Sequence, residues 1–261
     1  MNLLKGKKIL IMGLINKYSI AYGIAQACFE HGAELAFTFQ NEKIKTRLQK
    51  ISSEFNSSFI LPCNVTQDNE IHSTFDKIKK KWGTLNGLIH SIAFTPKNQI
   101  QGGNFMKNIN RKDYLISQEI STYSLIEISK NAFPLMKNSN GSIITLSYYG
   151  AEKVIPNYNT MGIVKSSLES SVRYLSFNLG MMNIRINAIS PGPIKTISSS
   201  RIKDFNKIKT IYKNSTPLQR NVSAKEIGKV AVFLCSDLSS GITGEIIHVD
   251  AGYHIMGITK N

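Results

Sequence analysis

The chain has 261 residues, 42% of them hydrophobic, and a formal net charge of +15. This length fits one α/β domain, and the hydrophobic fraction is that of an ordinary globular protein with a sizeable core. The apolar run nearest the N-terminus, residues 9–12, is too short for a signal peptide or a membrane-spanning helix, which argues against a membrane protein.

The positive charge and the cysteines indicate the setting in which the protein works. Lys, Asn and Ile recur together along the chain, so a coding bias toward lysine explains the charge better than a nucleic acid or an acidic carrier protein as partner. Cys28, Cys63 and Cys235 are far apart and lack metal-ligand spacing, which is typical of buried thiols in a reducing compartment. We therefore expect a cytoplasmic protein without a bound metal.

Apolar runs and helical periodicities alternate along the whole chain. The expected strands are residues 8–12, 35–39, 59–61, 87–92, 142–146, 184–189 and 246–249. The expected helices are residues 21–31, 43–55, 69–82, 114–136, 158–178 and 224–235. This alternation predicts right-handed crossovers and a doubly wound, parallel seven-stranded sheet flanked by helices in a single α/β domain. Residues 191–217 do not fit the alternation and are expected to form a loop with short helices, a candidate lid over a site.

The first strand is followed by a loop of small residues, at the strand end where doubly wound sheets bind ligands. Gly13 comes directly after that strand, and Ser19, Ala21 and Gly23 open the next helix. Small residues let the backbone approach a pyrophosphate, whose charge is favoured at a helix N-terminus. The spacing is not G-x-G-x-x-G, so the position of the loop, more than its pattern, indicates a dinucleotide site.

The next strand ends indicate which dinucleotide is bound. Gln40 follows the second strand; it can hydrogen-bond a ribose hydroxyl but brings no positive charge for a 2′-phosphate, so we expect NADH rather than NADPH. Asn64 and Val65 follow the third strand and are suited to flank the adenine. His90, in the fourth strand, is interpreted as structural rather than as a catalytic acid or base.

Tyr148, Tyr158 and Lys165 follow the fifth strand and are the candidate catalytic residues. Tyr158 and Lys165 are seven positions apart, which is about two turns on one face of a helix. An ammonium near a phenol favours its ionised form and strengthens it as a donor to a developing oxyanion, and Lys165 can also hold the nicotinamide ribose. The alternative is that the tyrosines are packing residues and the lysine is a solvated helix residue.

The sixth strand runs into a Pro-Gly-Pro turn. Pro191 and Pro193 flank Gly192 and force an extended, rigid chain. The backbone of Ile194 is then expected to meet the nicotinamide carboxamide, with Thr196 near the pyrophosphate.

These motifs resemble the short-chain dehydrogenase/reductase superfamily and, within it, the bacterial NADH-dependent enoyl-[acyl-carrier-protein] reductases. The similarity extends from about residue 6 to residue 252. Most of the superfamily places the lysine four positions after the tyrosine, and the interval of Tyr158-x-x-Met161-x-x-x-Lys165 is diagnostic of the enoyl reductase branch. The other segments that carry the resemblance are residues 13–23, 32–40, 90–92, 147–148, 155–162, 187–190, 192–194 and 233–237.

The resemblance implies a Rossmann-like fold, a homotetramer, and reduction of the trans-2 double bond of a fatty acyl thioester on acyl carrier protein, the last step of each elongation cycle. It implies that Tyr158 donates to the thioester oxygen, that Lys165 holds the ribose, that Tyr148 lines the acyl pocket and assists, and that Thr95 contacts substrate. The residues that it assigns to NADH are Gly13, Ser19, Ile20, Gln40, Asn64, Val65, Ile92, Lys165, Ile194, Lys195, Thr196, Ile197 and Ser198.

Four residues depart from the pattern of that family. Asn64 stands for the usual Asp, so its contact with the adenine amino group depends on an amide oxygen. Ala93 replaces a Gly beside the nicotinamide and adds a methyl group, and Pro191 and Ala251 replace small residues in backbone turns. None of the four removes a catalytic group.

The resemblance also gives the positive charge a use, because acyl carrier proteins are acidic. Arg201, Lys203, Lys207 and Lys209 lie beside the expected lid, where we expect them to steer the carrier. A 3-oxoacyl-thioester (carbonyl) reductase of the same superfamily is the alternative function, although Gly162 stands where that class has its lysine. We expect neither a nucleic-acid partner nor a membrane partner.

Overall fold

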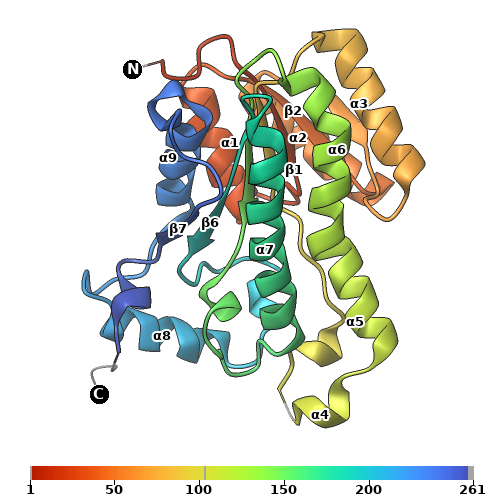
Figure 1. The fold of residues 1–261 in the computed structure, drawn as a ribbon. Coiled ribbons are helices and arrows are strands. Elements are labelled where there is room, and N and C mark those ends of the chain that lie inside the picture. The colour runs from red at the N-terminus through yellow and green to blue at the C-terminus, as the bar shows by residue number, and fades with distance from the viewer. Residues whose placement is uncertain (1, 103, 258–261) are drawn as a thin grey trace.

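The computed structural model describes residues 2–102 and 104–257, which form a parallel sheet of seven strands (Figure 1). The strand order is β3-β2-β1-β4-β5-β6-β7. The strands are β1 (Lys8–Met12), β2 (Glu34–Phe39), β3 (Ile60–Pro62), β4 (Gly87–His90), β5 (Ser142–Leu146), β6 (Arg185–Pro191) and β7 (Ile246–Val249). The predicted doubly wound α/β fold is confirmed, and the order of the strands reverses between β1 and β4.

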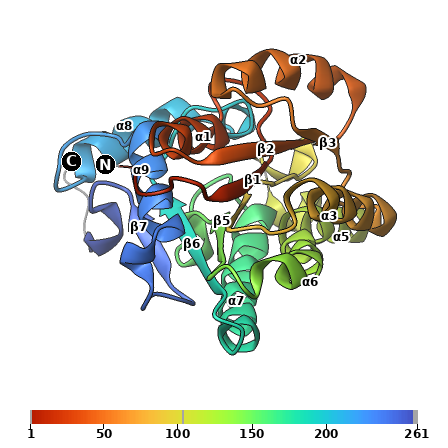
Figure 2. The same ribbon diagram turned by 90° about the horizontal axis from the view of Figure 1, so that it is seen from above.

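Helices cover both faces of the sheet, as the view from above shows (Figure 2). One layer holds α1 (Ile20–Glu30), α2 (Glu42–Ser52) and α9 (Ala224–Cys235), and the other holds α3 (Asp68–Trp82), α6 (Ser124–Met136) and α7 (Thr160–Gly180). Ile9 and Ile11 of β1 pack into the first layer, while Leu10 and Met12 pack into the second. Both faces of the sheet are therefore apolar, which accounts for its continuous hydrophobic strands.

Three shorter helices lie beyond the carboxyl edge of the sheet (Figure 1). They are α4 (Phe105–Asn108), α5 (Arg111–Gln118) and α8 (Phe205–Ser215). The last of them, with a 3₁₀ turn at Ser199–Arg201, fills most of the segment 191–217 that was expected to hold short helices. No helix of the described residues is long and apolar enough to cross a membrane.

Helix α1 and helix α9 cross at unusually close range. A Cβ atom on Gly23 would lie 2.5 Å from the carbonyl oxygen of Ala224, and one on Gly228 would collide with the carbonyl oxygen of Gly23. Only glycine at these two positions permits the contact. The small size of Gly23 is therefore required for the packing of α9 against α1.

Two expected helices differ from the observed ones, and both differences lie near the candidate site. The helix expected at 114–136 is interrupted by a π-helical turn, Glu119–Tyr123, because two side chains of this turn bond to neighbouring backbone. Ser121 bonds to both backbone groups of Phe94 at 2.9 Å, and Thr122 donates to the carbonyl of Val164 at 3.0 Å. The helix expected from residue 158 begins only at Thr160.

Candidate active site

The carboxyl ends of β1 and β4 meet at the point where the strand order reverses. Gly13 follows β1 in a left-handed conformation, with φ of +93°, and a Cβ atom there would overlap the carbonyl of Ser91 after β4. Ser19 caps the helix that follows by accepting a hydrogen bond from the backbone N–H of Tyr22. The turn therefore lets the chain after β1 pass close to the chain after β4, beside the N-terminus of α1, and such a helix N-terminus favours a phosphate group.

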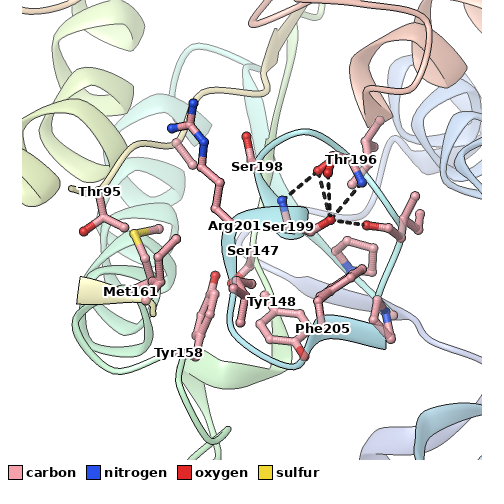
Figure 3. Close-up of a pocket in the computed structure, with 18 of the residues that line it drawn as sticks. Thr95, Ser147, Tyr148, Tyr158, Met161, Thr196, Ser198, Ser199, Arg201 and Phe205 are labelled. Carbon is pink, nitrogen blue, oxygen red and sulfur yellow. Dashed lines mark hydrogen bonds between the residues drawn. The ribbon is translucent and has the colours of Figure 1, made fainter. Parts of the chain in front are cut away.

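A cavity of about 180 Å³ is lined by residues at the ends of β4, β5 and β6 or just after them, and by Ile20 at the start of α1. Figure 3 shows the residues that line it. The cavity brings together seven of the residues expected to act in catalysis or to bind cofactor or substrate: Ile20, Thr95, Tyr148, Tyr158, Ile194, Thr196 and Ser198. Its remaining lining is largely apolar, which suits an acyl chain. The apolar residues that sequence reasoning did not assign to the site are Phe94, Ile100, Met161, Ile202 and Phe205.

Other predicted site residues lie outside this cavity. Gly13, Ser19, Gln40, Asn64, Val65 and Ile92 stand at strand ends or at the start of α1, along the same edge of the sheet. Lys195 and Ile197 are exposed, in the segment between β6 and the 3₁₀ turn, and do not line the cavity. Lys165 lies deeper, inside α7.

Tyr158 stands in a turn before α7 and not on the helix itself, which corrects the expected two-turn spacing from Lys165. The next residue, Asn159, has φ of 43°, so the chain bends sharply before it enters the helix. Tyr158 is 8% exposed, and its ring meets that of Tyr148 edge to face, with centroids 4.9 Å apart. Figure 3 shows the hydroxyl end of Tyr158 directed into the cavity.

Burial sets the protonation of both phenols. It raises the pKa of Tyr158 well above its usual value, with Tyr148 and Glu169 adding to the effect. It also raises the pKa of Tyr148 to about 12. The Lys165 ammonium was expected to lower the pKa of Tyr158. Lys165 is not among the groups that shift this pKa, so that expectation is wrong. Tyr158 is a neutral phenol at physiological pH.

Lys165 is only 5% exposed and is anchored to the end of β5. Its Nζ donates to the carbonyl of Leu146 at 2.6 Å. Burial lowers the pKa of Lys165 to about 8, and Glu169 opposes that shift. Glu169 in turn accepts a hydrogen bond from the hydroxyl of Ser147. Sequence reasoning missed Ser147 and Glu169, although the spacing of Glu169, four positions after Lys165, places it on the same face of α7.

Serine hydroxyls of α5 and the π-helical turn bind Thr95 and Phe94, two residues that line the cavity. The hydroxyls of Thr95 and Ser117 lie 2.8 Å apart. The bonds of Ser121 to Phe94 fix the adjacent residue, so the π-helical turn orients this wall. The sequence did not indicate that Ser117 or Ser121 contacts the site, because serines within a helix are usually neutral surface residues.

Asn64 does not offer the oxygen that was expected of it. Its Oδ1 already accepts hydrogen bonds from the backbone N–H and the hydroxyl of Thr66, at 3.2 and 3.1 Å. An amide oxygen has two lone pairs, and both are engaged. The expected contact from this oxygen to an adenine amino group is therefore corrected, and the free group of Asn64 is its amide nitrogen.

His90 is structural, as predicted. Its ring nitrogens lie 3.0 Å from the hydroxyl of Thr145 and 2.8 Å from that of Ser124. Burial, with a smaller contribution from Lys165, lowers the pKa of His90 to about 3, so the ring is neutral.

A glycine turn where the strand order reverses, with a tyrosine pair over the neighbouring strand end, defines an oxidoreductase of the short-chain dehydrogenase/reductase class. The model of the family Enoyl-(Acyl carrier protein) reductase matches residues 13–254 of the chain. The chain belongs to this family.

Full-length relatives support the same conclusion. The chain is 48% identical over 259 residues to the NADH-dependent enoyl-[acyl-carrier-protein] reductase FabI of Neisseria meningitidis, covering 99% of each. It is 44% identical over 260 residues to that of Escherichia coli, covering 100% of this chain and 98% of the relative.

Solved structures show the same similarity. The NADH-dependent enoyl-[acyl-carrier-protein] reductase of Aquifex aeolicus has a TM-score of 0.95 at 44% identity, covering 98% of this chain and 99% of the other. An Anaplasma phagocytophilum enoyl reductase solved in complex with NAD has a TM-score of 0.93 at 41% identity, covering 99% and 95%. The resemblance seen in the sequence is confirmed.

Proposed function

We propose that the chain is an NADH-dependent enoyl-[acyl-carrier-protein] reductase whose catalytic residues are Tyr158, Tyr148 and Lys165. The activity and the cofactor rest on membership of the family over the whole chain. The observation that carries the residue assignment is the Tyr158 hydroxyl, which makes no hydrogen bond to the described residues and faces an apolar cavity. A neutral phenol that faces an apolar cavity without a partner can donate its hydrogen bond to a bound substrate.

The reaction adds hydride to the β-carbon of a trans-2-enoyl thioester and moves an electron pair onto the thioester oxygen. NADH, when bound, supplies that hydride. Tyr158 donates a hydrogen bond to the oxygen as its negative charge forms, in a largely apolar cavity. Because burial keeps Tyr158 protonated, the donor is present throughout the physiological pH range. Protonation of the α-carbon completes the saturated acyl chain.

The chain's own residues fit a dinucleotide along the carboxyl edge. The close turn at Gly13, where a Cβ atom would collide with the carbonyl of Ser91, lies beside the N-terminus of α1. We assign to Lys165 the role of holding the ribose hydroxyls. The full set that we assign to NADH is Gly13, Ser19, Ile20, Gln40, Asn64, Val65, Ile92, Lys165, Ile194, Lys195, Thr196, Ile197 and Ser198.

A 3-oxoacyl-thioester reductase is disfavoured by the packing around Gly162. That class has its lysine at this position, but a Cβ atom on Gly162 would lie 2.8 Å from the carbonyl oxygen of Gly150. The deciding experiment follows loss of NADH absorbance with a short trans-2-enoyl thioester and, in parallel, with a 3-oxoacyl thioester. Turnover of the enoyl thioester is expected; turnover of the 3-oxoacyl thioester alone would replace this function with the other.

We assign residues 191–217 of this single reductase domain to substrate binding. The segment contributes Ile202 and Phe205 to the lining of the cavity, which also contains Thr95. Lys203 and Lys207 of the same segment are exposed, and Lys209 is partly so. Arg201 differs from the three lysines because it lines the cavity (Figure 3).

Reversal of two of these charges tests whether they steer an acidic carrier. The variant Lys203→Glu/Lys207→Glu is expected to lower kcat/KM for a carrier-linked enoyl substrate about tenfold at low salt, and less at high salt, because screening weakens steering. Turnover of a small enoyl thioester without carrier should stay within about twofold. The matched control is Lys79→Glu/Lys80→Glu in the exposed last turn of α3. Unchanged carrier-linked turnover at low salt would remove the steering role.

We propose a homotetramer, and the outer face of α7 supports self-association. Tyr174, Phe177 and Met181 are 74%, 78% and 90% exposed, beside a shallow hollow between α6 and α7. Large apolar side chains gathered on one helix face are typical of an interface. The variant Tyr174→Glu/Phe177→Glu is expected to lower the molar mass measured by light scattering. Met106→Glu, at an equally exposed position in α4, should leave it unchanged, and a monomeric parent protein would overturn the proposal.

We also expect the enzyme in the cytoplasm. Cys28, Cys63 and Cys235 are free and buried, as suits a reducing compartment. Recovery of the protein from any fraction other than the cytosol in a cell fractionation would contradict this.

A further inference from the structure

Gln99 is a buried amide for which the proposed mechanism has no use. It is 1% exposed, and both ends of its amide are hydrogen-bonded. Its Oε1 accepts from the hydroxyl of Thr160 at 2.7 Å, and its Nε2 donates to the carbonyl of Asn108 at 2.8 Å and to Oδ2 of Asp113 at 3.1 Å. One side chain therefore joins the end of α4, the first turn of α5 and the first residue of α7.

The start of α7 needs such support because the chain on either side of Tyr158 is strained. Asn157 and Asn159 have φ of 67° and 43°, in the left-handed region that residues other than glycine rarely adopt. Within the described part of the chain, the side chain of Asn159 does not cap the helix that follows it. The hydroxyl of Thr160 is buried and bonds to Gln99. The place of Tyr158 therefore depends on bonds from other segments.

A second set of bonds holds the chain just before Tyr158. The amide nitrogen of Asn157 donates to the carbonyl of Lys203 at 3.3 Å, and the N–H of Lys203 donates to the carbonyl of Ile100 at 3.0 Å. Ile100 and Tyr158 belong to one small buried apolar cluster, and both line the cavity. The chain on both sides of the tyrosine is thus tied to two successive residues, Gln99 and Ile100.

We propose that Gln99 is a positioning residue for Tyr158, its amide holding Thr160 and so the turn that directs the Tyr158 hydroxyl into the cavity. This inference rests on the proposed function, in which that hydroxyl donates to the thioester oxygen. The strength of a hydrogen bond depends on its distance and angle, so a turn that is free to shift donates less well. Because Lys203 lies in the segment 191–217, the same bonds link the substrate-binding segment to the donor.

Removing the amide while keeping the length of the side chain tests this role. Gln99→Met is expected to lower kcat for a trans-2-enoyl thioester about 5- to 10-fold, because the donor is displaced but not removed. The dissociation constant of NADH, measured by fluorescence, should stay within about twofold. The matched control is Gln118→Met in α5, where the amide bonds to the hydroxyl of Tyr114 at 3.1 Å, and it should leave kcat within about twofold.

Thr160 offers a milder variant that removes the same bond, and this variant carries the test if Gln99→Met does not fold. Thr160→Val is expected to lower kcat about 3- to 5-fold, whereas Thr160→Ser, which keeps the hydroxyl, should stay within about twofold of the parent value. The double variant Gln99→Met/Thr160→Val is expected to lose no more than Gln99→Met alone, since both changes remove one shared interaction.

A Tyr158→Phe background separates positioning from a structural role. In that background Gln99→Met is expected to have no further effect on kcat, because the hydroxyl that it positions is gone. A full additional loss there, or a loss of NADH affinity equal to the loss of kcat, would overturn the inference. If Tyr158→Phe lowers kcat while Gln99→Met and Thr160→Val leave it unchanged, this inference fails and the proposed function stands. A parent protein that does not reduce the enoyl thioester would overturn both.

Discussion

Replacing Tyr158 with phenylalanine is expected to lower kcat for a trans-2-enoyl thioester by about 10- to 100-fold while changing the NADH dissociation constant by less than about threefold. A hydrogen bond to an oxygen that gains charge contributes roughly 1.5–3 kcal/mol, and this one forms fully only in the transition state. The phenylalanine ring keeps the edge-to-face contact with Tyr148, so the cavity keeps its shape. Stopped-flow absorbance and a fluorescence titration measure the two quantities separately.

The matched control is Tyr149→Phe. Tyr149 is as buried as Tyr158, at 7% exposed, but its hydroxyl faces the carbonyl of His254 and does not line the cavity. The kcat of the Tyr149→Phe variant is expected to remain within about twofold of the parent value. Equal losses of turnover and of NADH affinity in Tyr158→Phe would contradict the role assigned to that phenol.

Replacing Lys165 with methionine is expected to weaken NADH binding about 10- to 100-fold, the contribution of hydrogen bonds from a charged donor. The same variant should unfold at a higher temperature than the parent protein. Burial lowers the pKa of Lys165 from 10.5 to about 8, so holding the charged side chain in the fold costs about 3 kcal/mol at neutral pH. Methionine fills a similar volume without that cost.

The gain in stability should depend on pH in a defined direction. Below pH 8 the lysine is protonated in both the folded and the unfolded chain, and the full cost is present. Between pH 8 and 10.5 the unfolded chain holds a proton that the folded chain has lost, so the parent protein gains stability as the pH rises. The advantage of Lys165→Met therefore shrinks over this window.

Thermal unfolding at several pH values measures this difference. Lys153→Met, at an exposed position beyond β5, is the control and should change neither NADH affinity nor stability. A variant Lys165→Met that melts below the parent protein at pH 7 would show that the lysine stabilises the fold.

The sequence predicted the fold because both faces of the sheet are buried. Continuous apolar strands such as β1 and β5 are readable without any knowledge of their neighbours. The strand ends also located Gly13, Gln40 and Tyr148, since ligand sites in this architecture lie at the carboxyl edge. The spacing of Tyr158 and Lys165 then indicated the branch of the superfamily.

What the sequence did not predict depends on contacts between distant segments. The π-helical turn exists because Ser121 bonds to Phe94, and neither residue signals the other. Helix α7 begins later than expected because the chain bends at Asn159, and the spacing of apolar residues does not predict such a bend. The raised pKa of Tyr158 reflects how completely tertiary packing buries a phenol, whereas sequence spacing suggested only the nearby ammonium.

The crossing of α1 and α9 has a consequence for how the enzyme is made. Gly23 and Gly228, which permit the contact, are separated by roughly 200 positions, and β1, which precedes α1, lies inside the sheet between β2 and β4. Contacts between residues so far apart in the sequence slow folding, because the entropy of closing a long loop is lost before the contact can stabilise the chain. On the ribosome, α1 remains uncovered until almost the entire nascent chain has emerged, so this helix reaches its native packing late although it is synthesised early.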